Sequence, residues 1–373
     1  MKHIGILGGG QLGRMSILAG RALGMRFSVF DPSPTACAGP VADHVFCAGY
    51  DDVDALNRFA EGLDVVTLEF ENVPGSACEV VAQHAPVHPS QRILTVAQHR
   101  RREKTYLSEH GFPCVPFEVA EDEAALEAAA ERLGFPCVAK TAAFGYDGKG
   151  QILLKARGDH AGVFDRLGQP DAVVVEAWIQ HTGEFSIVVA RRPDGTMATY
   201  PIAENIHRHH ILHTTIFPGR VGDDEAAEAD ALVRRLAVTM DLVGVMAVEL
   251  FRTDDGWRVN EIAPRPHNSG HATIDAAVTS QFEQHVRAVA DLPLGSTDIV
   301  RPAVMVNLLG DLWSNGAPPW SQLLEDPTVK LHLYDKGDAR PGRKMGHFTV
   351  LDDDVETALA RAERHFETLQ PKA

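Results

Sequence analysis

The chain has 373 residues, 45% of them hydrophobic and 23% charged, so we expect a globular protein of two or three domains. Its formal net charge of −16 disfavours nucleic acid or an anionic membrane as the main partner. Five cysteines without a C-x-x-C pair favour reduced thiols over disulfides or zinc. No apolar run approaches the roughly 18 residues of a membrane span and no signal peptide is recognisable, so we expect a cytoplasmic protein.

A glycine loop opens the chain. An apolar strand at residues 3–8 leads into Gly8, Gly10 and Gly13, and Asp31 ends the next strand, the spacing of a dinucleotide-binding fingerprint. Physically, the motif requires only that amides at a helix N-terminus approach a phosphate or another polar ligand. An NAD enzyme is therefore one interpretation among others.

Alternating helices and strands continue this pattern to about residue 95. We expect helices at 11–23, 52–62 and 74–84 and strands at 27–30 and 64–70. Glu69, Glu71 and Asn72 follow the third strand, where open α/β sheets bind ligands, although a polar surface loop is an equal alternative.

The next segment carries lysines and glycines. Helices are expected at 91–110 and 121–133, and a strand at 135–141. Lys140 lies inside that apolar strand, where it should either reach the edge or bind an anion. The glycine-rich loop at 144–151 offers amides and Lys149 to phosphates. It is no Walker A loop, because Gly150 stands where Ser or Thr would hold Mg²⁺; a plain glycine hairpin is the alternative.

Two polar positions and a histidine cluster follow. Glu176, in a strand at 172–178, and Glu184 are candidates for adenine or ribose binding. Residues 205–213 hold four histidines, and on a continuous strand His207 and His209 would point opposite to His210. We therefore favour a polar active-site loop over a zinc site, and expect a helix at 223–240.

A hairpin at 243–262 carries two carboxylates. Asp254-Asp255-Gly256 forms the turn, so Glu249 and Glu261 on the paired strands can project from one face toward a shared point. Two converging carboxylates suit Mg²⁺ with phosphate oxygens, whereas two water-facing strand residues are the simpler alternative. The polar loop that follows, 265–271, favours the metal site.

The C-terminal part has a helix, three strands and a closing helix. We expect these at 278–290, 303–309, 329–334, 347–351 and 355–369. Arg340, Arg343 and Lys344 form a basic group of phosphate size, unless they belong to a solvated loop.

Three motifs together resemble one family. FGYDGKGQ at 144–151, NEIAPRPHNSGH at 260–271 and YDK…RPGRKMGH at 334–347 resemble the ATP-grasp superfamily and, within it, the N5-carboxyaminoimidazole ribonucleotide synthases, from Gly5 to about Thr349. The resemblance implies carboxylation of 5-aminoimidazole ribonucleotide with ATP, Mg²⁺ and bicarbonate, through carboxyphosphate, in purine (IMP) synthesis, by a homodimer. A formate-dependent glycinamide ribonucleotide transformylase is the alternative within the superfamily, and an NAD-dependent dehydrogenase the alternative outside it.

The resemblance also implies a fold and its domains. It implies α/β and α+β architecture, an ATP-grasp fold with an N-terminal Rossmann-like domain and a small C-terminal domain. The expected boundaries are 1–95 for the first domain, 96–295 for ATP-grasp (small lobe 96–170, large lobe 171–295) and 296–373 for the last.

The same resemblance assigns residues to roles. Nucleotide contacts would come from Arg100, Lys140, Gly145, Tyr146, Asp147, Gly148, Lys149, Gly150, Gln151, Glu176, Ala177, Trp178, Ile179, Glu184, His207, Asn260 and Glu261. Magnesium would be held by Glu249 and Glu261. Bicarbonate and the aminoimidazole would meet Tyr146, Asp147, Arg265, His267, Asn268 and Ser269, with Asp147 and His267 as candidates for the amine proton. The ribonucleotide would contact Gln11, Leu12, Glu69, Lys336, Arg340 and Arg343. Ala263 departs from the superfamily, where many relatives place an Asn metal ligand.

Overall fold

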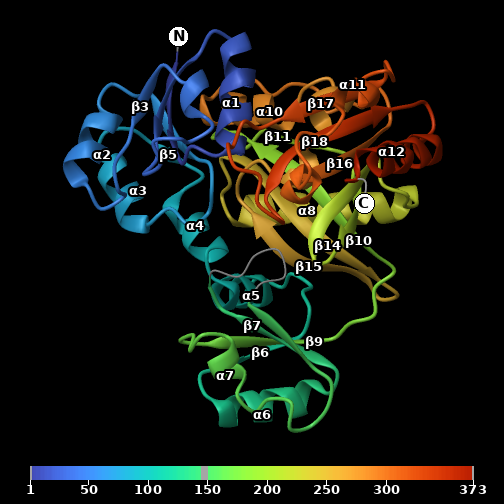
Figure 1. Cartoon of the computed structure of the whole chain (residues 1–373). Helices are drawn as coiled ribbons and strands as arrows, with labels where there is room; N and C mark the ends of the chain where they lie inside the picture. The colour runs from blue at the N-terminus through green and yellow to red at the C-terminus, as the bar shows by residue number, and fades with distance from the viewer. Residues whose placement is uncertain (1, 144–149, 372–373) are drawn as a thin grey trace.

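The computed structural model describes residues 2–143 and 150–371. Three sheets organise the chain: a parallel sheet at the N-terminus, a small antiparallel sheet, and a large antiparallel sheet that includes the C-terminal strands. Figure 1 shows the small sheet projecting away from the other two, joined to them through α5. Within the described ranges, no helix is both long and apolar enough to cross a membrane.

The N-terminal sheet is parallel, with strand order β3-β2-β1-β4-β5. Its strands are β1 (His3–Leu7), β2 (Arg26–Phe30), β3 (His44–Phe46), β4 (Val65–Leu68) and β5 (Val87–His88), and its helices are α1 (Gln11–Ala22), η1 (Gly39–Val41), α2 (Val53–Ala60) and α3 (Gly75–Val81). The strand order reverses between β1 and β4, so a crevice opens beyond their carboxyl ends. This crevice faces the rest of the molecule.

The single helix expected at 91–110 is two helices, α4 (Gln91–Ala97) and α5 (Arg100–Glu109). Tertiary hydrogen bonds cause the break. The Gln98 side chain donates to the carbonyls of Glu71 (2.6 Å) and Val73 (2.7 Å), and the Arg100 amide donates to the Ala142 carbonyl (2.7 Å). These bonds tie the junction to both neighbouring sheets, and helical periodicity alone does not encode them.

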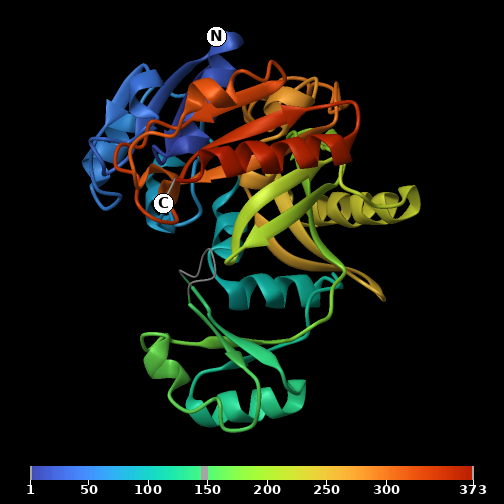
Figure 2. The same cartoon turned by 45° about the vertical axis from the view of Figure 1, so that its right-hand side comes forward.

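The small sheet has the antiparallel order β6-β9-β7-β8. It comprises β6 (Phe117–Ala120), β7 (Cys137–Thr141), β8 (Gln151–Leu154) and β9 (Val173–Ala177), with α6 (Glu123–Leu133) and α7 (Val163–Arg166) beside it. Figure 2 shows both helices on the face turned away from the large sheet. Strand β9 lies beyond the expected lobe boundary at residue 170, yet it pairs with β6 and β7, so the small sheet extends to Ala177.

The large sheet has nine antiparallel strands in the order β15-β14-β10-β12-β13-β16-β18-β17, with β11 beside β10. Its strands are β10 (Gly183–Arg191), β11 (Met197–Thr199), β12 (Ala203–Arg208), β13 (Ile211–Phe217), β14 (Gly244–Thr253), β15 (Gly256–Ala263), β16 (Ala303–Leu309), β17 (Val329–Leu333) and β18 (Lys344–Leu351). The accompanying helices are α8 (Asp223–Thr239), η2 (Asn268–Gly270), α9 (Thr273–Ala276), α10 (Gln281–Val289), η3 (Gly310–Trp313), α11 (Trp320–Leu323) and α12 (Val355–Leu369). Pairing of β13 with β16 makes the C-terminal strands β16–β18 continuous with strands β10–β15.

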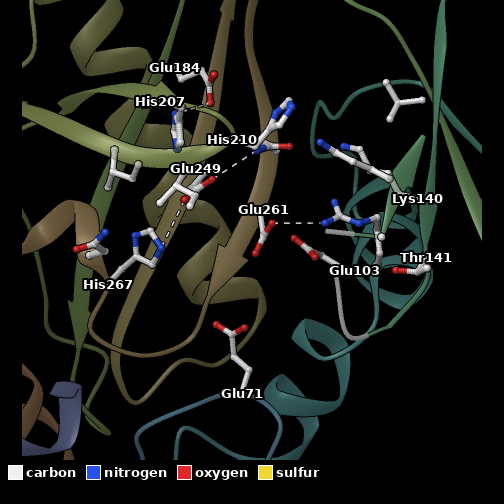
Figure 3. Close-up of a pocket in the computed structure, with 18 of the residues that line it drawn as sticks. Glu71, Glu103, Lys140, Thr141, Glu184, His207, His210, Glu249, Glu261 and His267 are labelled. Atoms are coloured by element: carbon white, nitrogen blue, oxygen red, sulfur yellow. Dashed lines mark hydrogen bonds and ion pairs between the residues drawn. The ribbon is translucent and has the colours of Figure 1, made fainter. Parts of the chain in front are cut away.

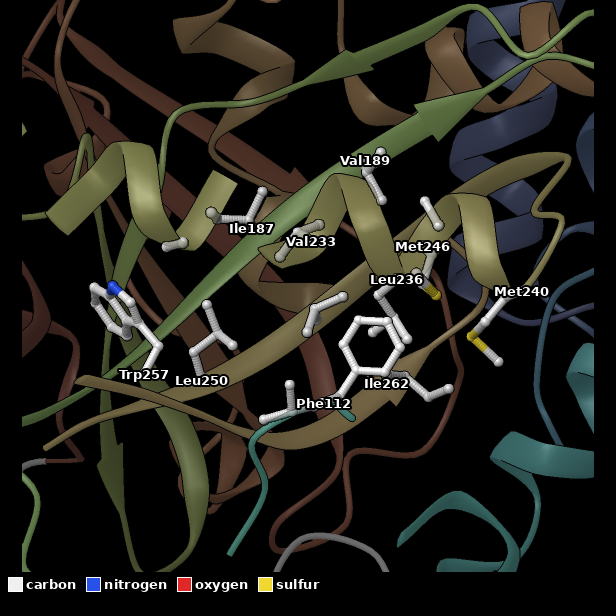
Figure 4. Packing of buried hydrophobic residues seen from close by; sticks show 14 of the residues in the cluster. Phe112, Ile187, Val189, Val233, Leu236, Met240, Met246, Leu250, Trp257 and Ile262 are labelled. Carbon is white, nitrogen blue, oxygen red and sulfur yellow. The ribbon is translucent and has the colours of Figure 1, made fainter. Parts of the chain in front are cut away.

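A buried core fixes the strands that carry the site. Val233 and Leu236 of α8 pack against Ile187 of β10 and Met246 of β14, all at most 1% exposed (Figure 4). Trp257 closes the far end, where its indole N–H donates to the Glu225 carbonyl at 2.9 Å. Because interiors pack densely, β14 and β15 have little freedom to shift under the cleft.

Candidate active site

A cleft of about 1360 Å³ lies where the three sheets meet. It is lined by Gln11 and Glu71 of the N-terminal domain, by α5, by β7–β9, by the β14–β15 hairpin, and by residues 336–344. The sequence motifs that lie far apart along the chain therefore face one cavity.

The dinucleotide fingerprint serves an internal purpose here. The Glu69 carboxylate occupies the N-terminus of α1, where it accepts the Leu12 amide at 3.1 Å, and a Cβ on Gly10 would collide with it. Asp31 accepts the Gly9 amide at 2.7 Å. Burial raises the pKa of Glu69. In a dinucleotide-binding protein, the amides at the N-terminus of α1 would bind the pyrophosphate and Asp31 would bind the ribose. Here both are hydrogen-bonded within the protein, which argues against the NAD interpretation.

Glu176 is the centre of a buried ion cluster. Its carboxylate lies 2.6 Å from Lys140 Nζ, 3.5 Å from Arg100 Nη1 and 3.8 Å from Lys104 Nζ. Burial alone would raise the pKa of Glu176, but Lys104, Lys140 and Arg100 outweigh it and lower the pKa to about 2. Burial lowers the pKa of Lys140. These three cations around the single Glu176 carboxylate leave a net positive charge at the cleft wall, which would favour binding of an anionic ligand.

Helix α5 contributes two residues whose roles the sequence analysis missed. Lys104 is fully buried and donates to the Asn260 carbonyl at 2.9 Å, and Glu103 accepts the Ile262 amide at 2.8 Å. Burial, followed by the charge of Glu261, raises the pKa of Glu103. The spacing of 100, 103 and 104 was a usable signal, because residues three and four apart share one helix face.

The hairpin places its carboxylates as expected. Glu249 and Glu261 are direct cross-strand partners, and the register shifts next to Glu249, so both Asn260 and Glu261 line the cleft. The Asn260 side chain donates to Glu249 at 3.5 Å, and Figure 3 shows the Glu249 and Glu261 side chains in the cleft. Burial and then the charge of Glu261 raise the pKa of Glu249. Among the residues that the structure describes, no third His, Cys, Asp or Glu completes a metal-binding group.

The loop after the hairpin holds two ordered side chains. Arg265 Nη2 lies 2.9 Å from Glu71, linking the hairpin to the N-terminal domain. His267 accepts the Ser269 amide at Nδ1 (3.3 Å), so its proton resides on Nε2, which faces Glu249 at 3.5 Å. Burial keeps the pKa of His267 well below its ordinary value. Asn268 lines the cleft, and its buried side-chain nitrogen, Nδ2, finds no hydrogen-bond partner in the described part of the chain.

The histidine segment corrects one expectation. His207 lies one residue before the end of β12, His209 and His210 form the turn into β13, and all three line the cleft. The expected alternation of faces was wrong because the chain turns at these two residues, which both have positive φ. His207 Nδ1 lies 3.1 Å from Glu184. Burial lowers the pKa of His207, but the bond to Glu184 outweighs burial and raises it.

The basic segment, residues 336–344, also lines the cleft. Lys336 donates to the Lys344 carbonyl at 3.1 Å, and Arg343 donates to the Lys336 carbonyl at 3.0 Å, so the segment is internally braced. Gly310 permits this arrangement, since a Cβ there would collide with the Arg340 backbone. Burial lowers the pKa of Lys336.

The structure brings together most of the residues singled out from the sequence. Those lining the cleft are Gln11, Arg100, Lys140, Gly150, Gln151, Glu176, Ala177, Trp178, Ile179, Glu184, His207, Glu249, Asn260, Glu261, Arg265, His267, Asn268, Lys336, Arg340 and Arg343. Leu12, Glu69 and Ser269 lie behind the lining and hold other site residues. Gly145, Tyr146, Asp147, Gly148 and Lys149 lie outside the described residues.

Family models match three consecutive parts of the chain. They are a ribonucleotide synthetase preATP-grasp domain at residues 1–98, an ATP-grasp domain at 105–282, and a phosphoribosylaminoimidazole carboxylase C-terminal domain at 303–361. The order agrees with the three regions of the fold.

Known proteins are similar over nearly the whole chain. The N5-carboxyaminoimidazole ribonucleotide synthase of Pseudomonas aeruginosa is 42% identical over 96% of this chain and 97% of its own, and that of Bacillus subtilis is 41% identical over 93% and 91%. An ADP complex of an N5-carboxyaminoimidazole ribonucleotide synthetase superposes with a TM-score of 0.93 at 40% identity, covering 98% of this chain and 96% of that one. The Aspergillus clavatus enzyme with ADP and 5-aminoimidazole ribonucleotide gives 0.89 at 30% identity, over 99% and 98%. The chain belongs to the N5-carboxyaminoimidazole ribonucleotide synthase family of ATP-grasp proteins.

Proposed function

We propose that this protein carboxylates 5-aminoimidazole ribonucleotide to N5-carboxyaminoimidazole ribonucleotide in purine biosynthesis, consuming ATP and bicarbonate. The observation that carries the proposal is the single cleft in which the Glu176 ion cluster, the Glu249–Glu261 pair and the basic segment 336–344 face one another. The names of relatives similar over the whole chain, including one solved with ADP and the ribonucleotide, support the same substrates. The match to a carboxylase C-terminal model favours this reaction over formate transfer to glycinamide ribonucleotide.

The nucleotide would lie between the small sheet and the hairpin. Lys140 and Arg100 present positive charge there, while the exposed Trp178 and the half-buried Ile179 line the same cleft and suit an adenine ring. The Gly145–Lys149 part of the glycine-rich loop would add its amides, as the motif predicts.

Glu249 and Glu261 fit a magnesium ion. Two carboxylates directly opposite each other, one with a raised pKa, repel, and Arg100, 3.6 Å from Glu261, offsets only one of the two charges. Mg²⁺ commonly takes one or two protein carboxylates and completes its shell with phosphate oxygens and water. When bound, the ion would offset the charge of the triphosphate.

The chemistry brings two anions together. A bicarbonate oxygen attacks the γ-phosphorus of ATP, ADP leaves, and carboxyphosphate forms; Lys140 and Arg265 would offset the repulsion. The amine of the ribonucleotide then takes the carboxyl carbon, phosphate leaves, and the amine loses a proton. His267 carries its own proton on Nε2 and would orient Glu249, so we assign the accepting role to Asp147.

The ribonucleotide's phosphate would bind the basic segment. Lys336, Arg340 and Arg343 line the cleft together with Gln11 and Glu71 of the N-terminal domain. The substrate site would therefore span the first and last parts of the chain. A homodimer and a cytoplasmic location remain predictions.

The test is ADP release with Mg-ATP and bicarbonate, with and without 5-aminoimidazole ribonucleotide. We expect strong stimulation by the ribonucleotide and formation of the carboxylated product. In a parallel reaction, formate with glycinamide ribonucleotide should not stimulate. Stimulation only in that second reaction would replace the proposal with the transformylase alternative. No stimulation by either, in protein shown to bind ADP, would overturn the substrate assignment.

A further inference from the structure

The β12–β13 turn has an unusual backbone for its residues. His209 and His210 have φ of 51° and 64°, in the left-handed region. Two-residue hairpin turns of this kind favour Asn-Gly or Gly-Gly, because a side chain there is strained by about 1–2 kcal/mol per residue. Strain of this kind often marks functional sites, where the surrounding structure maintains it.

The turn conformation places the His210 side chain at the cleft, which it helps to line. Burial raises the pKa of Glu184, but His207, then His181 and then His210 outweigh burial and lower it. In Figure 3 the His210 ring points into the open space that separates Glu249 from Lys140. That space lies between the proposed magnesium site and the lysine expected to meet the phosphates.

We propose that His210 is a further nucleotide-binding residue, whose imidazole N–H donates to the phosphate chain of ATP. The assignment rests on the proposed function, because it takes the nucleotide to lie between Lys140 and the Glu249–Glu261 pair. A turn of Asn-Gly would form the same hairpin without strain but would present no ring to the cleft.

Replacing His210 with glycine separates binding from stability. Glycine adopts positive φ freely, so His210→Gly should not lower the thermal midpoint of unfolding. A lost hydrogen bond to a charged phosphate corresponds to an increase of about tenfold or more in the KM for ATP. A ring that merely stabilises the hairpin would give the opposite pattern, a lower midpoint with unchanged KM.

Gln169→Gly is the matched control. Gln169 also has positive φ (55°), is exposed in the small lobe, and does not line the cleft. It should therefore tolerate glycine equally well while leaving the KM for ATP unchanged.

The experiment measures the KM for ATP, the dissociation constant of ADP with Mg²⁺, and competitive inhibition by adenosine, which lacks phosphates. The expected result is weaker ATP and ADP binding in His210→Gly with adenosine inhibition unchanged. Unchanged ATP and ADP constants, or equal weakening of adenosine, would overturn the proposal. Wild-type turnover in the same assay tests the proposed function separately, so failure of one does not imply failure of the other.

Discussion

The paired glutamates show how single residues set the chemistry of this cleft. Glu249 and Glu261 face each other across adjacent strands, and the charge of Glu261 helps to raise the pKa of Glu249. Repulsion between two carboxylates disfavours folding, and a bound cation would relieve it. The presence of the pair in this cleft therefore supports the proposed metal site. Removing one negative charge should therefore affect turnover far more than folding.

We expect Glu261→Gln to lower kcat by about two orders of magnitude or more, because transition-state charge would lose its counter-ion. The thermal midpoint should change little, since loss of the repulsion with Glu249 offsets loss of the 3.6 Å ion pair with Arg100. Steady-state kinetics at saturating Mg²⁺ with a melting curve would measure both. Glu363→Gln, at an exposed position of α12, is the control and should change neither. Near-normal turnover in Glu261→Gln would contradict the metal assignment.

At the scale of elements, α5 fixes the base of the hairpin. Glu103 and Lys104 bond to backbone groups of β15 on either side of Glu261. Burial and the charge of Glu261 raise the pKa of Glu103 above its ordinary 4.5, so the folded protein retains a proton that the unfolded chain releases. The contribution of Glu103 to the free energy of unfolding is full below about pH 4.5. It is lost as the pH rises through the pKa that Glu103 has in the folded protein.

Glu103→Gln mimics the protonated side chain and tests this directly. In protein without ligands, the variant should match wild type near pH 5 and be more stable near pH 9, as denaturant unfolding would show. Glu103→Ala should lose about 1–3 kcal/mol at both pH values, because the Ile262 amide then lacks its acceptor. A glutamine variant less stable than wild type at pH 9 would indicate that Glu103 is ionised and paired with Lys104.

The elements also show what sequence reasoning reached and what it missed. Hydrophobic periodicity with Gly256 predicted the β14–β15 hairpin, and the opposition of Glu249 and Glu261 followed from it. The break at Gln98 and the turn at His209 depend on hydrogen bonds or backbone angles set by other parts of the chain. The sequence also could not show what the glycine loop binds, because the carboxylate that accepts the Leu12 amide belongs to Glu69, 57 residues further along the chain.

At the scale of the molecule, the site depends on how the N-terminal domain meets the large sheet. His285 of α10 is buried between them. Its Nδ1 accepts the Val245 amide at 3.2 Å, so its Nε2–H donates to Thr67 Oγ1 at 2.7 Å. Thr67 lies on β4, which leads to Glu69 and Glu71, whereas Val245 is the second residue of the strand that carries Glu249. One side chain thus connects the strands from both sides of the cleft.

We expect His285→Leu to leave the Val245 amide and the Thr67 hydroxyl unpaired and to destabilise the protein by about 1–3 kcal/mol for each. The KM for the ribonucleotide should rise more than the KM for ATP, because the proposed ribonucleotide site takes Gln11 and Glu71 from the N-terminal domain and the proposed ATP site does not. His84→Leu, an exposed change in the same domain, is the control. Melting curves and both KM values measured below the variant's transition provide the test. Equal increases in the two constants would show that His285 supports the fold as a whole and does not orient the first domain over the cleft.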